Sequence, residues 1–118
     1  MRALFPVKPA VGPGPVAGIG SVLLLPELLS KPLREQSKVE LAELGALLSR
    51  LDLRPTDEAT AELATALGAS HRLRAADAVH LATAVGAGAD RFLTDNRTDF
   101  PKSIAEIDIT YPDELPEP

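Results

Sequence analysis

The sequence contains no cysteine and no tryptophan, and aromatic residues make up only 3% of its 118 residues. The absence of cysteine excludes a disulfide framework and thiolate zinc sites, and it suits a reducing cytoplasm, where we expect the protein to reside. So few aromatic side chains make it hard to build the base-stacking platforms that single-strand binders use. These absences leave oxygen ligands as the main candidates for carrying chemistry.

The chain also lacks an excess of basic residues over acidic ones. The chain has 12 Lys and Arg against 17 Asp and Glu, a formal net charge of −5, whereas non-specific nucleic-acid binders usually carry the opposite sign. An acidic protein can still act on nucleic acid if its acids hold divalent metals that meet the phosphates. The apolar runs at 22–25 and 28–29 are far too short to span a bilayer, and we find no secretory signal.

Proline and glycine are concentrated at the N-terminus. Residues 1–20 hold four prolines and four glycines, a spacing that disfavours a regular helix and a central strand. We therefore expect a flexible or extended leader over 1–20, one domain over 21–111 and a loose, acidic, proline-rich tail over 112–118. The hydrophobic fraction of 45% is enough for one buried core.

Within the expected domain, strand and helix patterns alternate. The spacing predicts, in order, a short strand or turn ending near Leu25, a helix from Pro26 that Pro32 bends or restarts, a helix over Leu33–Leu51, a strand over Leu51–Arg54, a helix over Ala59–Leu67 with Thr56 as N-cap, a helix over Ala75–Val85, and strands over Arg91–Thr94 and Ile104–Tyr111. This alternation predicts an α/β domain with a mostly parallel sheet.

Several acidic residues lie in otherwise uncharged or strand-end segments, where an ordinary surface role is a weaker explanation. Glu27 is the only charge between Ser21 and Ser30, and Asp77 opens a helix whose next stretch is otherwise uncharged. Asp95 and Asp99 follow a predicted strand. Each acid taken alone is more often structural than catalytic, but three or four converging carboxylates would bind Mg²⁺ or Mn²⁺. Such a metal activates water and stabilises the leaving oxygen in phosphodiester cleavage.

Three segments resemble the PIN-domain family, particularly the VapC-like toxins. The stretch from Leu73 to Ala84 (LRAADAVHLATA) resembles the family's signature helix. The stretch from Gly88 to Phe100 (GADRFLTDNRTDF) resembles its strand and acidic loop, and Leu24 to Leu29 (LLPELL) resembles the segment with its helical Glu. The resemblance covers about Val22 to Tyr111.

This resemblance implies a three-layer α/β/α domain and a metal-dependent endoribonuclease of the kind that serves as toxin in a type II toxin–antitoxin pair. Glu27 and Asp77 match metal-binding acids, Thr94 matches the hydroxyl residue that ends the strand, and the last position of the site falls on Asp95, Asn96 or Asp99. The implied cofactor is Mg²⁺ or Mn²⁺. The implied partners are RNA, a cognate antitoxin and a second copy of the chain, with no membrane.

One departure from the family pattern leaves other interpretations open. PIN domains usually begin with a strand that ends in a metal-binding Asp, whereas no Asp or Glu precedes Glu27 here. The sequence therefore predicts that this strand is absent or degenerate. The alternatives are an inactive PIN-like remnant that binds a protein partner, and a small α/β interaction module whose acids are surface charge. For His80 we expect a partly buried helix histidine, rather than a metal ligand or general base.

Overall fold

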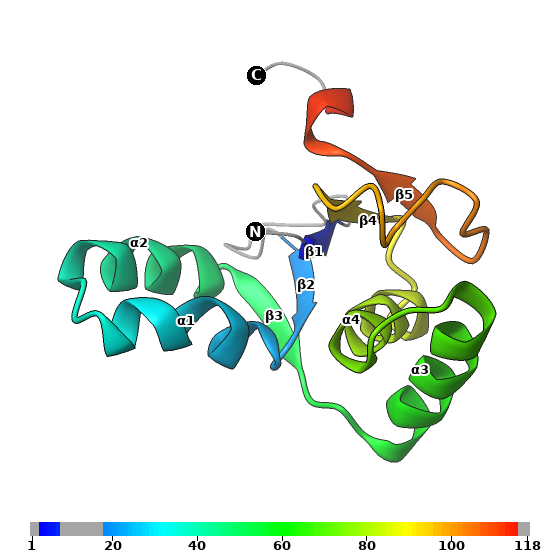
Figure 1. Ribbon diagram of the computed structural model, residues 1–118, viewed down its shortest axis with the longest axis horizontal. Helices are drawn as coiled ribbons and strands as arrows, with labels where there is room; N and C mark the ends of the chain where they lie inside the picture. Colours follow the sequence, from blue (N-terminus) through cyan, green and yellow to red (C-terminus); the bar gives the residue numbers. More distant parts are fainter. Residues whose placement is uncertain (1–2, 8–17, 116–118) are drawn as a thin grey trace.

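The computed structural model describes residues 3–7 and 18–115 (Figure 1). In chain order, its elements are β1 (Ala3–Val7), β2 (Gly18–Ser21), α1 (Leu24–Arg34), α2 (Lys38–Leu48), β3 (Leu51–Arg54), α3 (Glu58–His71), α4 (Ala75–Gly86), β4 (Arg91–Thr94), β5 (Asp108–Thr110) and a 3₁₀ turn at Pro112–Glu114. The predicted strands and helices between Leu51 and Thr94 are all present at nearly the predicted positions.

The strands form two hydrogen-bonded groups. β2 pairs in parallel with β3, from Gly18 opposite Leu51 to Ser21 opposite Arg54, and β4 pairs in parallel with β5. β1 runs antiparallel to β4 and also lies beside β2. α1 and α2 form the crossover between β2 and β3, as a parallel pair requires. The structure thus confirms the predicted α/β class with mostly parallel strands.

Helices lie on both sides of the strands (Figure 1). α1 and α2 pack against each other on one side of β2 and β3, while α3 and α4 lie on the other side, with α4 against β1, β2 and β4. This arrangement is the expected α/β/α layering. It brings the beginning of α1 next to α4, and this contact positions two of the candidate acids.

The hydrophobic core is divided in two. The larger cluster joins α3, α4, β4, β5 and the loop between these strands, with the Phe92 and Phe100 ring centroids 4.9 Å apart. α4 contributes mostly alanines, which allow α3 to approach closely. The smaller cluster joins α1, α2 and β3 through Leu24, Leu48 and Leu51. The two halves of the molecule are therefore stabilised by separate sets of apolar contacts.

The structure corrects the expectation for the N-terminal 20 residues. We expected a flexible or extended leader over 1–20, yet β1 and β2 both lie in this segment; residues 1–2 and 8–17 are outside the described residues. Gly20 is buried in β2, and a Cβ there would meet Leu24 Cδ1 at 2.6 Å. This glycine permits the close approach of α1 and so belongs to a packed strand. β1 runs antiparallel to β4 and carries no acid, which agrees with the expectation that the strand ending in a metal-binding Asp is absent or degenerate.

The predicted helix over Leu33–Leu51 is wrong. α1 continues through Pro32 to Arg34, the chain reverses at Gln36 with φ 56°, and α2 begins after Ser37, whose Oγ accepts a hydrogen bond from Glu40 N at 3.4 Å. The sequence Ser-Lys-Val-Glu holds the Ser-x-x-Glu pattern of a helix start, and this local signal outweighs the continuous leucine periodicity.

Smaller boundaries differ as well. Asp57 caps α3 in place of Thr56, because its carboxylate accepts from Thr60 N at 2.8 Å. The last strand covers only Asp108–Thr110 of the predicted Ile104–Tyr111. In the expected loose tail, Pro112–Glu114 forms a turn with its own hydrogen bonds, and residues 116–118 lie outside the described residues.

Candidate functional site

Glu27 and His80 connect the beginning of α1 to α4. The His80 Nε2 atom lies 2.8 Å from Glu27 Oε1, with the histidine side chain 4% exposed and the glutamate side chain 32% exposed. A buried imidazole needs a hydrogen-bond partner, and the carboxylate supplies a charged acceptor. The expectation of a buried helix histidine is confirmed, and its partner is one of the candidate metal-binding acids.

Asp77 lies in the first turn of α4, one turn before His80. Its side chain is 2% exposed, which is unusual for a carboxylate. The partial positive charge at the helix N-terminus favours an acid at this position, and a buried charge also requires polar contacts with its surroundings. Glu27 and Asp77 thus belong to the first turns of two helices that the Glu27–His80 contact joins.

The loop after β4 is held by its own polar side chains. Thr94 is fully buried, and its Oγ1 accepts a hydrogen bond from Asn96 N at 3.1 Å. Asn96 Nδ2 donates to Asp99 Oδ2 at 2.9 Å, and Asp99 N donates to Asn96 Oδ1 at 3.1 Å. Asp95 is exposed. Thr94 therefore fixes the start of the loop, and the Asp99 carboxylate takes part in closing it.

The four candidate acids do not form a ready-made metal site. Within residues 3–7 and 18–115, no group of three or more His, Cys, Asp or Glu residues is arranged to hold a metal ion. The described side chains as they stand therefore do not fit a pre-assembled divalent-metal centre. Two acids are present at the α1–α4 junction, while Asp95 and Asp99 belong to the separate loop.

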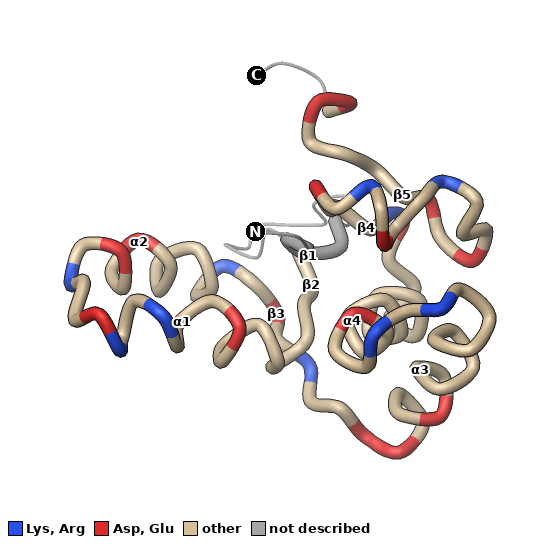
Figure 2. Tube along the Cα trace, viewed as in Figure 1, with Lys and Arg blue, Asp and Glu red and all other residues tan. Residues whose placement is uncertain are grey.

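The same loop carries two cations, and each of them forms an ion pair. Arg97 Nη2 lies 2.7 Å from Asp113 Oδ2, and Lys102 Nζ lies 2.6 Å from Glu114 Oε2. The hydrogen bond between Lys102 and Glu114 raises the pKa of the lysine and lowers the pKa of the carboxyl. Figure 2 shows the basic residues of this loop near the acidic turn at the C-terminal end of the described chain.

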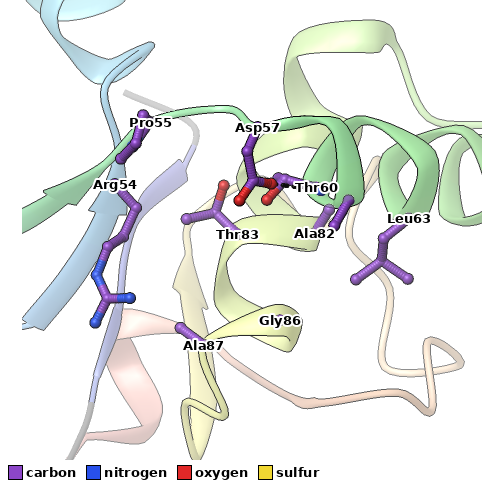
Figure 3. Close-up of a pocket in the computed structure, with 10 residues that line it drawn as sticks. Arg54, Pro55, Asp57, Thr60, Leu63, Ala82, Thr83, Gly86 and Ala87 are labelled. Atoms are coloured by element: carbon purple, nitrogen blue, oxygen red, sulfur yellow. Dashed lines mark hydrogen bonds between the residues drawn. The ribbon is translucent and has the colours of Figure 1, made fainter.

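A cavity of about 430 Å³ lies elsewhere, between the end of β3, the start of α3 and α4 (Figure 3). Its polar lining includes Arg54, Asp57 and Thr83, and none of the predicted site residues borders it. Asp57 accepts the capping hydrogen bond from Thr60 N, and Thr83 Oγ1 donates to Val79 O at 2.7 Å. Asp57 and Thr83 thus stabilise α3 and α4, and Arg54 pairs with Asp52 in β3. Since no predicted site residue lines this cavity, it is separate from the candidate site.

Comparison with known proteins identifies the class of this fold. The family model described as PIN domain matches residues 17–103, which is most of the chain. The chain therefore belongs to the PIN-domain family. Neither a curated protein nor a solved structure matches it. The PIN domain is a nuclease-type fold, and PIN nucleases generally act on nucleic acid with divalent metals. No helix in the described part of the chain is long and apolar enough to cross a membrane.

Proposed function

We propose that this PIN domain is a metal-dependent endoribonuclease resembling the toxin of a type II toxin–antitoxin pair. The observation that carries the proposal is the contact between Glu27 and His80, because it joins the first turn of α1 to α4 one turn after Asp77. Glu27 and Asp77 would be the metal-binding acids, with Mg²⁺ or Mn²⁺ as cofactor. Asp95, Asp99 or Asn96 would complete the site, and Thr94 would position their loop.

The small number of acids at the α1–α4 junction is compatible with this proposal. Mg²⁺ keeps several waters and is often bound by only one or two carboxylates together with substrate phosphates. The RNA itself would then supply ligands that the protein lacks. A cytoplasmic location, a cognate antitoxin and a homodimer belong to the same proposal, and the exposed Leu25, Leu33 and Val39 offer apolar surface for such partners.

Cleavage of a mixed RNA panel tests the proposal. The purified chain is assayed with Mn²⁺, Mg²⁺ or EDTA, beside Glu27→Gln, Asp77→Asn and the control Glu62→Gln on the exposed face of α3. We expect metal-dependent cleavage that falls at least about 100-fold in Glu27→Gln and Asp77→Asn and persists in the control. Circular dichroism confirms that each variant is folded. No cleavage by the folded parent chain would overturn the ribonuclease assignment.

A catalytically inactive PIN-like protein that binds a partner is the second candidate. It is favoured by the lack of a three-residue metal group within the described residues and by the apolar side chains exposed on α1 and α2. The cleavage assay together with a calorimetric Mn²⁺ titration separates the two candidates, because a folded chain that neither cleaves RNA nor binds Mn²⁺ would fit only the second.

A further inference from the structure

The loop between β4 and β5 holds two basic residues, Arg97 and Lys102, and both lie over one aromatic ring. The Arg97 guanidinium carbon is 4.2 Å from the centroid of Tyr111, and Lys102 Nζ is 5.2 Å from it. The Tyr111 side chain is fixed, since the residue is 6% exposed and its hydroxyl donates to Phe100 O at 2.8 Å. Both cations therefore lie close to the same buried ring.

An acidic turn neutralises this pair. Asp113 and Glu114, adjacent in the Pro112–Glu114 turn, contact Arg97 and Lys102 respectively. The second carboxylate oxygen of Glu114 accepts a hydrogen bond from Tyr111 N at 2.8 Å, which fixes the turn against the ring. Two adjacent carboxylates thus bind the two cations that could otherwise contact phosphates of a polyanion.

We infer that the acidic turn competes with RNA: it occupies Arg97 and Lys102, which are a binding site for backbone phosphates on the loop that carries Asp95, Asn96 and Asp99. This inference rests on the proposed function, because it takes RNA as the substrate. The location supports it, since Arg97 follows Asn96 directly and Lys102 lies three residues after Asp99 in the same loop.

The exposure of the four side chains makes this competition reversible. The side chains of Arg97 and Asp113 are 55% and 68% exposed, and those of Lys102 and Glu114 are 51% and 39% exposed. Ion pairs this exposed are individually weak and are screened by salt. A polyanion that brings several phosphates at once can displace them, whereas an isolated phosphate gains little.

Binding of a fluorescent single-stranded RNA of mixed sequence tests the inference in EDTA, where cleavage does not interfere. The variant Asp113→Asn/Glu114→Gln removes the competing charges, and the amide introduced at position 114 keeps an oxygen for the Tyr111 N–H. We expect it to bind RNA roughly 3–10-fold more tightly than the parent chain. Since each phosphate contact on a single strand contributes about 0.7 to the slope of log K against log salt, the slope should steepen by about 1.4.

Three further variants make the result specific. Adding Arg97→Gln/Lys102→Gln to the first variant should abolish the gain. Glu43→Gln/Glu62→Gln removes two exposed acids from α2 and α3 and changes the net charge equally, and it should leave the slope unchanged. Asp113→Asn alone should give about half of the slope change, about 0.7. A gain in the α2 and α3 control as large as in the turn variant, or no gain in the turn variant, would overturn the inference.

The two proposals fail in different ways. Metal-dependent cleavage without a gain in RNA binding by the turn variant would leave the ribonuclease in place and remove the competing turn. A gain in RNA binding without any cleavage would keep the phosphate site and remove the ribonuclease activity. Equal thermal midpoints, within a few degrees, for the parent chain and the turn variant show that the comparison is made between folded proteins.

Discussion

At the residue scale, the most informative contact is between Glu27 and His80, which lie 53 positions apart in the chain. His80 is almost fully buried, so its ring N–H needs an acceptor inside the protein. Glu27 meets this need from the neighbouring helix and still keeps about a third of its side chain in contact with solvent. One carboxylate therefore stabilises the α1–α4 junction while remaining accessible from outside.

Glu27→Ala should destabilise the protein by about 1–3 kcal/mol, because the buried imidazole loses its charged acceptor. Glu27→Gln keeps an acceptor oxygen and should cost less. Urea unfolding followed by circular dichroism measures both changes in the free energy of unfolding. The control Glu43→Ala, an exposed acid on α2, should stay within about 0.5 kcal/mol of the parent. Equal effects of Glu27→Ala and Glu43→Ala would contradict a structural role for this contact.

At the element scale, α3 depends on a charged cap. The Asp57 carboxylate accepts a hydrogen bond from Thr60 N, and hydrogen bonds with Thr60 hold the pKa of this carboxyl below its ordinary value of 3.8. A depressed pKa means that the folded state favours the ionised carboxylate. The cap therefore contributes its full stability above the unfolded pKa, and this contribution is lost as the pH falls through the folded pKa.

Asp57→Ser keeps a capping oxygen but removes the titration. We expect the thermal midpoint of the parent chain to fall more steeply between about pH 5 and pH 2.5 than that of Asp57→Ser, since only the parent loses an ionised cap. This window is roughly the range in which a carboxyl group with a lowered pKa titrates. Thermal melts across this range measure the difference. Parallel curves for the two proteins would show that the charge of the cap does not contribute.

Two glycines in regular elements give opposite expectations. Gly45 lies within α2, and a Cβ added there meets nothing within 4 Å, so Gly45→Ala should stabilise by about 0.5–1 kcal/mol through helix propensity. Gly20 in β2 faces Leu24 Cδ1 at 2.6 Å, so Gly20→Ala should destabilise by about 1–3 kcal/mol through overpacking. Denaturant unfolding of both variants checks the signs. Stabilisation by Gly20→Ala would contradict the close packing of β2 on α1.

At the scale of the whole molecule, the two apolar clusters predict that the two halves differ in their resistance to local unfolding. The larger cluster includes Leu81, with no exposed surface, whereas the smaller one consists of Leu24, Leu48 and Leu51 with partly buried neighbours. α1 and α2 pack mainly on each other and on β3, so fewer apolar contacts hold them to the rest of the chain. Local opening should therefore begin in this half.

Leu81→Ala should cost about 3–5 kcal/mol, as expected for a fully buried leucine whose removal leaves a cavity, and Leu48→Ala should cost clearly less. Native-state hydrogen exchange provides the second measurement, and we expect the amides of α2 to exchange at least about tenfold faster than those of α4. Uniform protection of both helices would mean that the two clusters unfold as one unit.

The sequence by itself determined the α/β class, the positions of β3, α3, α4 and β4, and the PIN-like segments around Asp77 and Thr94. The class and the element positions follow from local periodicity, helix stops and turn residues, which act within a few positions of the chain, whereas the PIN-like segments rest on resemblance to the family. The Ser-Lys-Val-Glu start of α2 and the Asp57 cap are also local signals, because capping patterns involve residues only three positions apart.

Only the tertiary structure decided the strands at Ala3–Val7 and Gly18–Ser21, because sheet pairing and close approach to α1 outweigh the local bias of proline and glycine. It likewise decided that His80 contacts Glu27, that Arg97 and Lys102 share the Tyr111 ring, and that the described acids do not gather into a group of three. Each of these depends on the distance between side chains far apart in the chain, and that distance is set by how helices and strands pack rather than by any local pattern.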